Sequence, residues 1–247
     1  MNWKKKLATY ASLSILATFI IHIINKLIYF MSTIDNLLGK KEGLYYEWRF
    51  GKIFYTKEGT GKPILLIHDL SACSSEYEWN RIVSDLSKTN TVYTLDLLGC
   101  GKSDKPNFTY TNFLYVQLVT DFINNVIGEK ADIIVTGNSC SFVLMACHNN
   151  DEIIDKILLI NPPSISSISK APTKRTKMLK FIINIPFIGT LLFNLLHSKD
   201  SIEQTFMTEY FYTPQFVDDE IVKTYCESAQ ISKTQSKYLF ASIKGKF

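Results

Sequence analysis

Apolar residues in the middle of the chain alternate between two spacings, and this alternation predicts strands and helices in turn. Six short runs rich in β-branched, aromatic and leucine residues are typical of strands: 45–50, 52–57, 63–68, 91–97, 132–136 and 156–160. Between them, apolar residues recur at helical spacing in 76–87, 112–127 and 139–149. Gly51 joins the first two runs as a hairpin. The later order of strand and helix predicts an α/β fold with a mostly parallel sheet built from βαβ units.

The last third of the chain has a different pattern. From Asn161 to the C-terminus the segments are typical of helices and loops, and none is convincing as a strand. We therefore divide the folded part into an α/β core at 44–161 and a helical cap region at 162–247. The apolar stretch 178–196 is interrupted at Pro186, which favours a broken pair of cap helices over a second membrane span. Four basic residues at its leading edge leave an interfacial role open: Lys174, Arg175, Lys177 and Lys180.

The N-terminal segment predicts a membrane anchor. Three lysines, Lys4 to Lys6, precede the uncharged apolar run 7–24, which would be about 27 Å long as a helix. This favours an uncleaved single-pass helix at residues 1–31, followed by a linker at 32–43. A cleaved signal peptide is the main alternative, although no A-x-A site follows Ile24. A buried helix of a soluble domain is the third interpretation. The side of the membrane stays open, because the lysines favour an outward domain and the unpaired cysteines favour the cytosol.

Size and composition limit the remaining classes of function. With 247 residues, 46% of them hydrophobic, the chain is long enough for one α/β domain with a full core. Its net charge of +4 is spread thinly, without a basic stripe, so we expect no nucleic-acid partner. The five cysteines are odd in number and form no C-x-x-C pair, so neither a disulfide framework nor a zinc site is indicated. We expect no metal and no cofactor.

Three motifs lie in order between the predicted strands. They are PILLIHDL at 63–70, DLLGCGKSDKP at 96–106 and GNSCS at 137–141. Together they resemble the α/β-hydrolase family, and especially its helical-cap branch, which includes esterases and haloalkane dehalogenase-like hydrolases. The first is similar to the strand and His-Gly turn that forms half of the oxyanion hole. The second is similar to the family's D-x-x-G-x-G-x-S turn, and the third occupies the position of the G-x-S-x-G nucleophile elbow.

The resemblance implies roles for three residues. Ser139 would be the nucleophile, held in a strained conformation with its hydroxyl projecting over the sheet and small residues on either side. The backbone N–H groups of Cys140 and Leu70 would donate to the oxyanion. A serine at this position implies acyl transfer, on an ester or similar bond of a small hydrophobic substrate. The alternative for Ser139 is a helix N-cap without chemistry. His68 is expected to be structural.

The same resemblance also shows what the sequence lacks. The family places an acid and then a histidine after the nucleophile, each behind a later strand, and neither strand is recognisable here. After Ser139 the histidines are His148, about 13 Å along the same predicted helix, and His197 in the cap. We therefore expect a C-terminally shortened serine hydrolase. The alternatives are a non-catalytic binding protein with a capped apolar pocket and, third, a membrane-structural protein.

Overall fold

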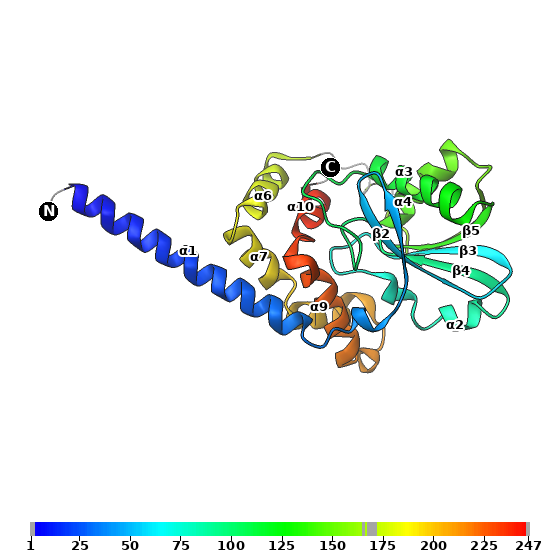
Figure 1. Ribbon diagram of the computed structural model, residues 1–247, viewed down its shortest axis with the longest axis horizontal. Coiled ribbons are helices and arrows are strands. Elements are labelled where there is room, and N and C mark those ends of the chain that lie inside the picture. The colour runs from blue at the N-terminus through cyan, green and yellow to red at the C-terminus, as the bar shows by residue number, and fades with distance from the viewer. Residues whose placement is uncertain (1–2, 165, 167–171, 246–247) are drawn as a thin grey trace.

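The computed structural model describes residues 3–164, 166 and 172–245, in which one sheet is flanked by helices and a long helix projects from the folded body (Figure 1). The strands are β1 (Leu44–Trp48), β2 (Gly51–Glu58), β3 (Lys62–Ile67), β4 (Asn90–Leu95), β5 (Ala131–Thr136) and β6 (Ile154–Ile160). Their spatial order is β1-β2-β4-β3-β5-β6. The β1–β2 hairpin is antiparallel and joins β4 antiparallel, whereas β4, β3, β5 and β6 pair in parallel. The predicted hairpin and parallel sheet are confirmed.

Each central strand buries both of its faces, which explains its continuous apolar sequence. Side chains alternate along a strand, so Leu65 and Ile67 of β3 join the core on one face of the sheet, while Ile64 and Leu66 join the core on the other. The first face is covered by α3 (Asn112–Phe122), its π-helical extension η3 (Ile123–Ile127) and α4 (Ser139–Asn149). The second is covered by η2 (Glu76–Trp79) and α2 (Val83–Leu86).

One helix differs from its prediction. Residues 76–87 were expected to form a single helix, but the structure divides them into the 3-10 turn η2 and the four-residue helix α2. The apolar side chains of Trp79 and Val83 still reach the core, because both turns keep them on the sheet side. Helical spacing therefore indicated the buried face correctly and overestimated the regularity of the backbone.

The described residues after β6 form helices and loops, and none of them is in a strand. Its elements are α6 (Lys174–Asn184), α7 (Ile188–Leu196), α8 (Lys199–Thr205), η4 (Phe206–Tyr210), η5 (Pro214–Phe216), α9 (Asp219–Thr234) and α10 (Lys237–Gly245). The predicted break at Pro186 is confirmed, and α6 and α7 meet there at 108°. α10 lies against both α6 and the core: Leu239 joins the main core cluster, and the Ser242 hydroxyl accepts from Tyr110 N–H at 3.1 Å.

The N-terminal helix α1 (Trp3–Thr33) is a single helix of 31 residues that stands away from the sheet (Figure 1). Its most apolar stretch is exposed, and it is long and apolar enough to cross a membrane. Only the C-terminal part contacts the folded body, through α7 and α9, and its one buried residue is Asn25. The short turn η1 (Leu38–Lys40) then leads the chain to β1, with the Leu37 N–H donating to Glu227 of α9 at 2.7 Å.

Candidate active site

The motifs at 63–70 and 137–141 come together at one edge of the sheet. β3 and β5 are parallel neighbours with Ile67 paired to Val135, so the turns that follow both strands lie at their shared carboxyl edge. The first turn contains His68 and Asp69, and the second contains Gly137 and Ser139. In open parallel sheets this edge is where ligands and reacting groups are usually held. The sequence therefore predicted correctly which segments meet.

The motif at 96–106 has a structural role at the same edge. Asp96, directly after β4, is fully buried and accepts the N–H groups of Glu76 and Lys102, both at 2.7 Å. The Ser103 hydroxyl donates to the Asp96 carbonyl at 2.6 Å and accepts the Phe54 N–H at 2.8 Å. Asp96 and Ser103 thus tie the turn after β4 to η2 and to β2, and these contacts occupy their polar groups.

Gly137 makes the sharp turn between β5 and α4. It has φ of +54°, whereas Ser139 is not among the residues with positive φ. The expectation of a strained middle residue is therefore wrong for this structure, because the glycine two positions earlier takes the left-handed conformation at little cost. A Cβ at Gly137 would also lie 2.2 Å from the Asp69 Oδ1 atom, so the position has no room for a side chain.

Ser139 begins α4 with its side chain turned inward. The residue is fully buried, and its hydroxyl donates to the His68 carbonyl oxygen at 2.6 Å. The expected hydroxyl projecting over the sheet is therefore not observed. With its proton engaged by a backbone carbonyl and its oxygen shielded from solvent, Ser139 in this arrangement joins the two turns and is not poised for attack. The helix begins after Asn138, so Ser139 is not the N-cap either.

The two backbone donors assigned to an oxyanion both lie beside acceptors. The Cys140 N–H donates to the Gly137 carbonyl at 3.2 Å. The Leu70 N–H faces the Asp69 side chain, where it opposes the rise that burial causes in the pKa of that carboxyl. The same carboxylate accepts the Asn138 N–H at 2.6 Å and the Asn138 side-chain amide at 3.2 Å. Asp69 therefore lies between the two turns and takes up N–H groups that surround the place where an anion would be stabilised. Burial is the main influence on its pKa and raises it.

Glu78 is a partly buried carboxyl at this edge, and no motif in the sequence indicated it. It accepts the Asp69 N–H at 3.2 Å and the Thr136 hydroxyl, which places it between the ends of β3 and β5. Burial raises the pKa of Glu78 to about 7, the hydrogen bonds oppose that rise, and the nearby Asp69 charge adds to it. Asp69 and Glu78, two carboxyls of raised pKa, thus lie at the carboxyl edge of β3 and β5. The sequence predicted a helix over 76–87, and only the tertiary structure places Glu78 at this edge.

The histidines do not provide a base for Ser139. His68 uses both ring nitrogens, with Nδ1 2.7 Å from the Asp69 carbonyl and Nε2 accepting the Leu97 N–H at 3.0 Å, and burial lowers its pKa to about 4. His148 is exposed near the far end of α4. His197 ends α7, stacks on Phe193 with ring centroids 4.1 Å apart and bonds the Phe193 carbonyl. The structural role expected for His68 agrees with its contacts.

No metal ligand group is found among the described residues 3–164, 166 and 172–245, where no three His, Cys, Asp or Glu side chains lie together. An open groove of about 420 Å³ lies elsewhere, between α1 and the start of α7. Its lining residues are Ser14, Ile15, Thr18, Phe19, His22 and Phe187, so it belongs to the N-terminal helix and the cap.

Comparison with known proteins agrees with this architecture. The chain is 33% identical over 86 residues to 2-hydroxy-6-oxo-6-(2'-aminophenyl)hexa-2,4-dienoic acid hydrolase of Metapseudomonas resinovorans, covering 34% of this chain and 29% of that protein. It is 24% identical over 183 residues to a soluble epoxide hydrolase of Corynebacterium sp. (strain C12), covering 70% and 62%. The chain thus spans less than two thirds of the length of either relative.

The structure and the family pattern lead to the same assignment. The solved structure of the epoxide hydrolase CorEH without ligand superposes with a TM-score of 0.64 at 17% identity, covering 83% of this chain and 73% of that one. A family pattern described as the alpha/beta hydrolase family matches residues 64–241, which is more than half of the chain. With its sheet order, its cap and the turns after β3 and β5, the chain belongs to the alpha/beta hydrolase family.

Proposed function

We propose that this chain is a membrane-anchored hydrolase of the alpha/beta hydrolase family, with Ser139 as the nucleophile for an ester or similar acyl bond. The observation that supports this role is the position of Ser139. It starts α4 directly after β5, beside the turn that follows β3, so one hydroxyl and several backbone N–H groups gather at the carboxyl edge of parallel strands. The relatives are named for hydrolysis of an epoxide and of a substituted hexadienoic acid, which supports a small hydrophobic substrate.

Catalysis requires two changes at this edge, and a base. The Ser139 hydroxyl must leave the His68 carbonyl, so that its oxygen can attack the substrate carbonyl while a base takes the proton. The Asp69 carboxylate must release the Leu70 N–H, so that this group can face the oxyanion. The base must be a group other than the four described histidines. Until these changes occur, we expect turnover lower by about a millionfold than with a complete triad.

A fluorophosphonate probe tests the role of Ser139 directly, because its phosphorus bonds the serine oxygen and releases fluoride. We expect slow labelling of the full chain in detergent, detected by mass spectrometry on the peptide that contains Ser139. Ser139→Ala should abolish the label, and Ser141→Ala, which changes another serine of the same turn, should keep it. Asp69→Gly should increase the labelling rate, because it removes the carboxylate that occupies the N–H groups. Equal labelling of the parent and Ser139→Ala would contradict the proposal.

A second candidate function is ligand binding without catalysis. The observation that favours it is that the polar groups of the site already bond each other. The Ser139 hydroxyl donates to the His68 carbonyl in the turn after β3, and the Asp69 carboxylate accepts the Asn138 N–H in the turn after β5. In that case no serine is labelled even after prolonged exposure, also in Asp69→Gly. Small hydrophobic esters and alcohols would still raise the melting temperature of the protein. Labelling at Ser139 decides between the two candidates.

The anchoring half of the proposal rests on α1. Leu16 and Ile20 are exposed in the middle of its apolar run, at 55% and 48% of their full accessible surface, and an uncovered apolar helix of this length is stable in a bilayer. After expression, the full chain should stay in the membrane pellet during alkaline carbonate extraction. The double variant Leu16→Arg, Ile20→Arg should move to the supernatant, because two charges at the centre of a span oppose insertion. Extraction of the parent chain by carbonate would contradict the anchor.

A further inference from the structure

The corner between α6 and α7 lies beside the apolar run of α1. The His22 and Phe187 rings have centroids 5.5 Å apart with nearly perpendicular planes. The groove of about 420 Å³ between the two elements reaches from Ser14 to His22 along α1 and is closed at one side by Phe187. These positions belong to the run 7–24 that would cross the hydrocarbon. The corner is therefore level with the C-terminal end of the expected span.

Two amides fix this arrangement. The Asn25 side-chain amide donates to the Phe187 carbonyl at 3.0 Å, and the Asn194 amide donates to Asn25 Oδ1 at 3.0 Å. The chain of contacts joins α1, the corner and α7, and both asparagines are buried. The Phe187 carbonyl also accepts the Leu191 N–H at 2.9 Å, so Asn25 adds a second hydrogen bond at the start of α7. Polar side chains that bond between helices in this way are typical of helices packed inside membranes.

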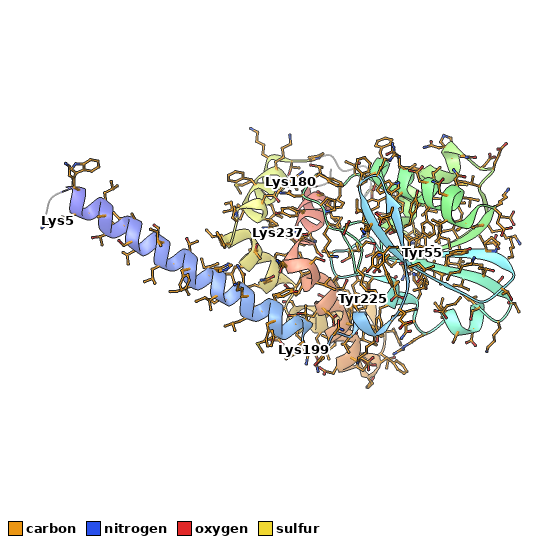
Figure 2. All side chains as sticks on the ribbon, in the orientation of Figure 1. Lys5, Tyr55, Lys180, Lys199, Tyr225 and Lys237 are labelled. Atoms are coloured by element: carbon orange, nitrogen blue, oxygen red, sulfur yellow. The ribbon has the colours of Figure 1, made fainter. Side chains whose placement is uncertain are left out.

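The outer surface of the α6–α7 pair is apolar and uncovered. Six large side chains on it are exposed by 40% or more: Met178, Phe181, Phe187, Ile188, Leu195 and Leu196. The opposite surface is held to the protein by two lysines, Lys180 donating to Thr109 and Lys237 of α10 donating to Thr190, at 2.8 and 2.9 Å (Figure 2). The apolar surface therefore points outward in a fixed orientation, on the side of the protein from which α1 projects (Figure 1).

The charges along this pair are suited to a lipid surface. Lys174, Arg175 and Lys177 are exposed at the start of α6, the end farther from the corner, and none forms a salt bridge among the described residues. Residues 172–198 contain no Asp or Glu. A basic end and an apolar corner match the order of a bilayer with anionic headgroups above its acyl chains.

We propose that α6 and α7 form a re-entrant membrane element, whose corner enters the hydrocarbon beside α1 while Lys174, Arg175 and Lys177 contact anionic headgroups. This inference rests on the proposed anchoring by α1. Taken together, the two helices are apolar and long enough to be a broken span, and the 108° bend returns the chain to the side it came from. The partner of this surface is the lipid bilayer, and the cap thereby becomes part of the anchor.

Photocrosslinking of the full chain in phospholipid nanodiscs tests the inference. Benzoylphenylalanine is placed at one of three exposed apolar positions: Phe19 in the middle of α1, Phe181 on α6, or Ile82 beside α2 as the matched control. We expect lipid adducts at 19 and at 181, detected by mass spectrometry, and none at 82. In discs with phosphatidylglycerol the yield at 181 should exceed the yield in phosphatidylcholine discs. The triple variant Lys174→Gln, Arg175→Gln, Lys177→Gln should reduce that excess roughly fivefold.

The outcomes separate this inference from the proposed anchor. Adducts at 19 without adducts at 181 leave α1 as a span and overturn the re-entrant element. Adducts at 181 to a second copy of the protein also overturn it, because the surface is then a protein interface. A lack of adducts at 19 refutes the anchor, and the inference with it.

Discussion

The turns after β3 and β5 and the contact between α1 and α7 both bury polar groups, but they use different ones. At the sheet edge, Asp69 and Glu78 are carboxyls that accept backbone N–H groups. Between α1 and α7, Asn25 and Asn194 are neutral amides that bond each other and one carbonyl. Carboxyls need several donors to be buried, and two tight turns supply them. Two packed helix surfaces offer few free backbone groups, because these groups already bond within each helix. A pair of neutral amides therefore costs less free energy to bury there than a carboxylate would.

The two regions are therefore expected to respond to different conditions, the sheet edge to pH and the helix contact to lipid. The sheet edge holds ionisable groups whose charge state depends on pH, so its stability and accessibility can respond to the solution. The α1–α7 contact is held by two neutral amides, so we expect it to respond instead to whether lipid or water surrounds it. The proposed chemistry and the proposed anchoring thus lie in regions with different sensitivities, and variants can separate them.

Gly137→Ala is expected to cause the largest loss of stability, and it acts at the sheet edge. The new Cβ would sit in a left-handed conformation and displace the Asp69 carboxylate from its donors, at a cost of about 4 kcal/mol in the free energy of unfolding. Gly128→Ala is the matched control, because Gly128 also has positive φ, +77°, but nothing within 4 Å of an added Cβ. It should cost about 1 kcal/mol. Urea unfolding measures both, and equal losses would show that Asp69 is not held against Gly137.

Glu78→Gln should change the pH dependence of stability at the sheet edge. The folded pKa of Glu78 is raised to about 7 from 4.5, so the folded protein keeps a proton that the unfolded chain releases between these values. Stability is therefore lost as the pH rises from 4.5 to 7, by up to roughly 3 kcal/mol. The variant has no such loss, so its stability relative to the parent should improve over this window. Melting temperatures of the variant and the parent at pH 5 and pH 8 measure the change. The same difference between the two proteins at both pH values would contradict the prediction.

The cap should respond to pH in the opposite direction. Burial lowers the pKa of His197 from 6.5 to about 4, so the unfolded chain binds a proton that the folded protein refuses between these values. Stability from His197 is complete above pH 6.5 and falls as the pH drops toward 4, by roughly 3 kcal/mol. His197→Phe keeps the ring between Phe193 and Phe240 and removes the proton site. Its unfolding free energy should fall less between pH 6.5 and 4.5 than that of the parent, and an unchanged slope would contradict this.

The smallest effect is expected at the amide pair. Asn25→Leu and Asn194→Leu should each lower stability in nanodiscs, and the double variant should lose less than the sum, because the second change removes a partner that is already gone. We expect a coupling of about 1 kcal/mol. Thermal unfolding of the four proteins in the same lipid measures it. Strict additivity would mean that the two amides do not act as a pair.

Much of the fold could be predicted because its signals are local. The apolar run of β3, the small residues around Gly137 and the turn residues between Asp96 and Ser103 each dictate a conformation within a few positions. The parallel order followed from alternating strands and helices, and the broken cap pair followed from Pro186. The helix expected at 76–87 was too regular, because spacing shows which face is buried and not whether the backbone keeps its hydrogen bonds.

The state of the site could not be predicted in the same way. The motifs indicated that the turns containing Leu70 and Ser139 would come together, and these turns do share an edge, since their strands are neighbours. The motifs did not indicate that Asp69 would take the free N–H groups, that Ser139 would face the His68 carbonyl, or that Glu78 would lie between the strands. These features depend on side chains from three separate segments competing for the same donors.

Local sequence was enough to predict the apolar N-terminal helix, the order of strands and helices, and the two turns where polar groups gather, because each depends on residues close together in the chain. It was not enough to predict which donors those polar groups receive, or that the corner at Phe187 packs against the end of the apolar run of α1. Hydrogen bonds between distant segments and the depth at which two helices meet are set by packing of the whole protein, and no local pattern encodes them.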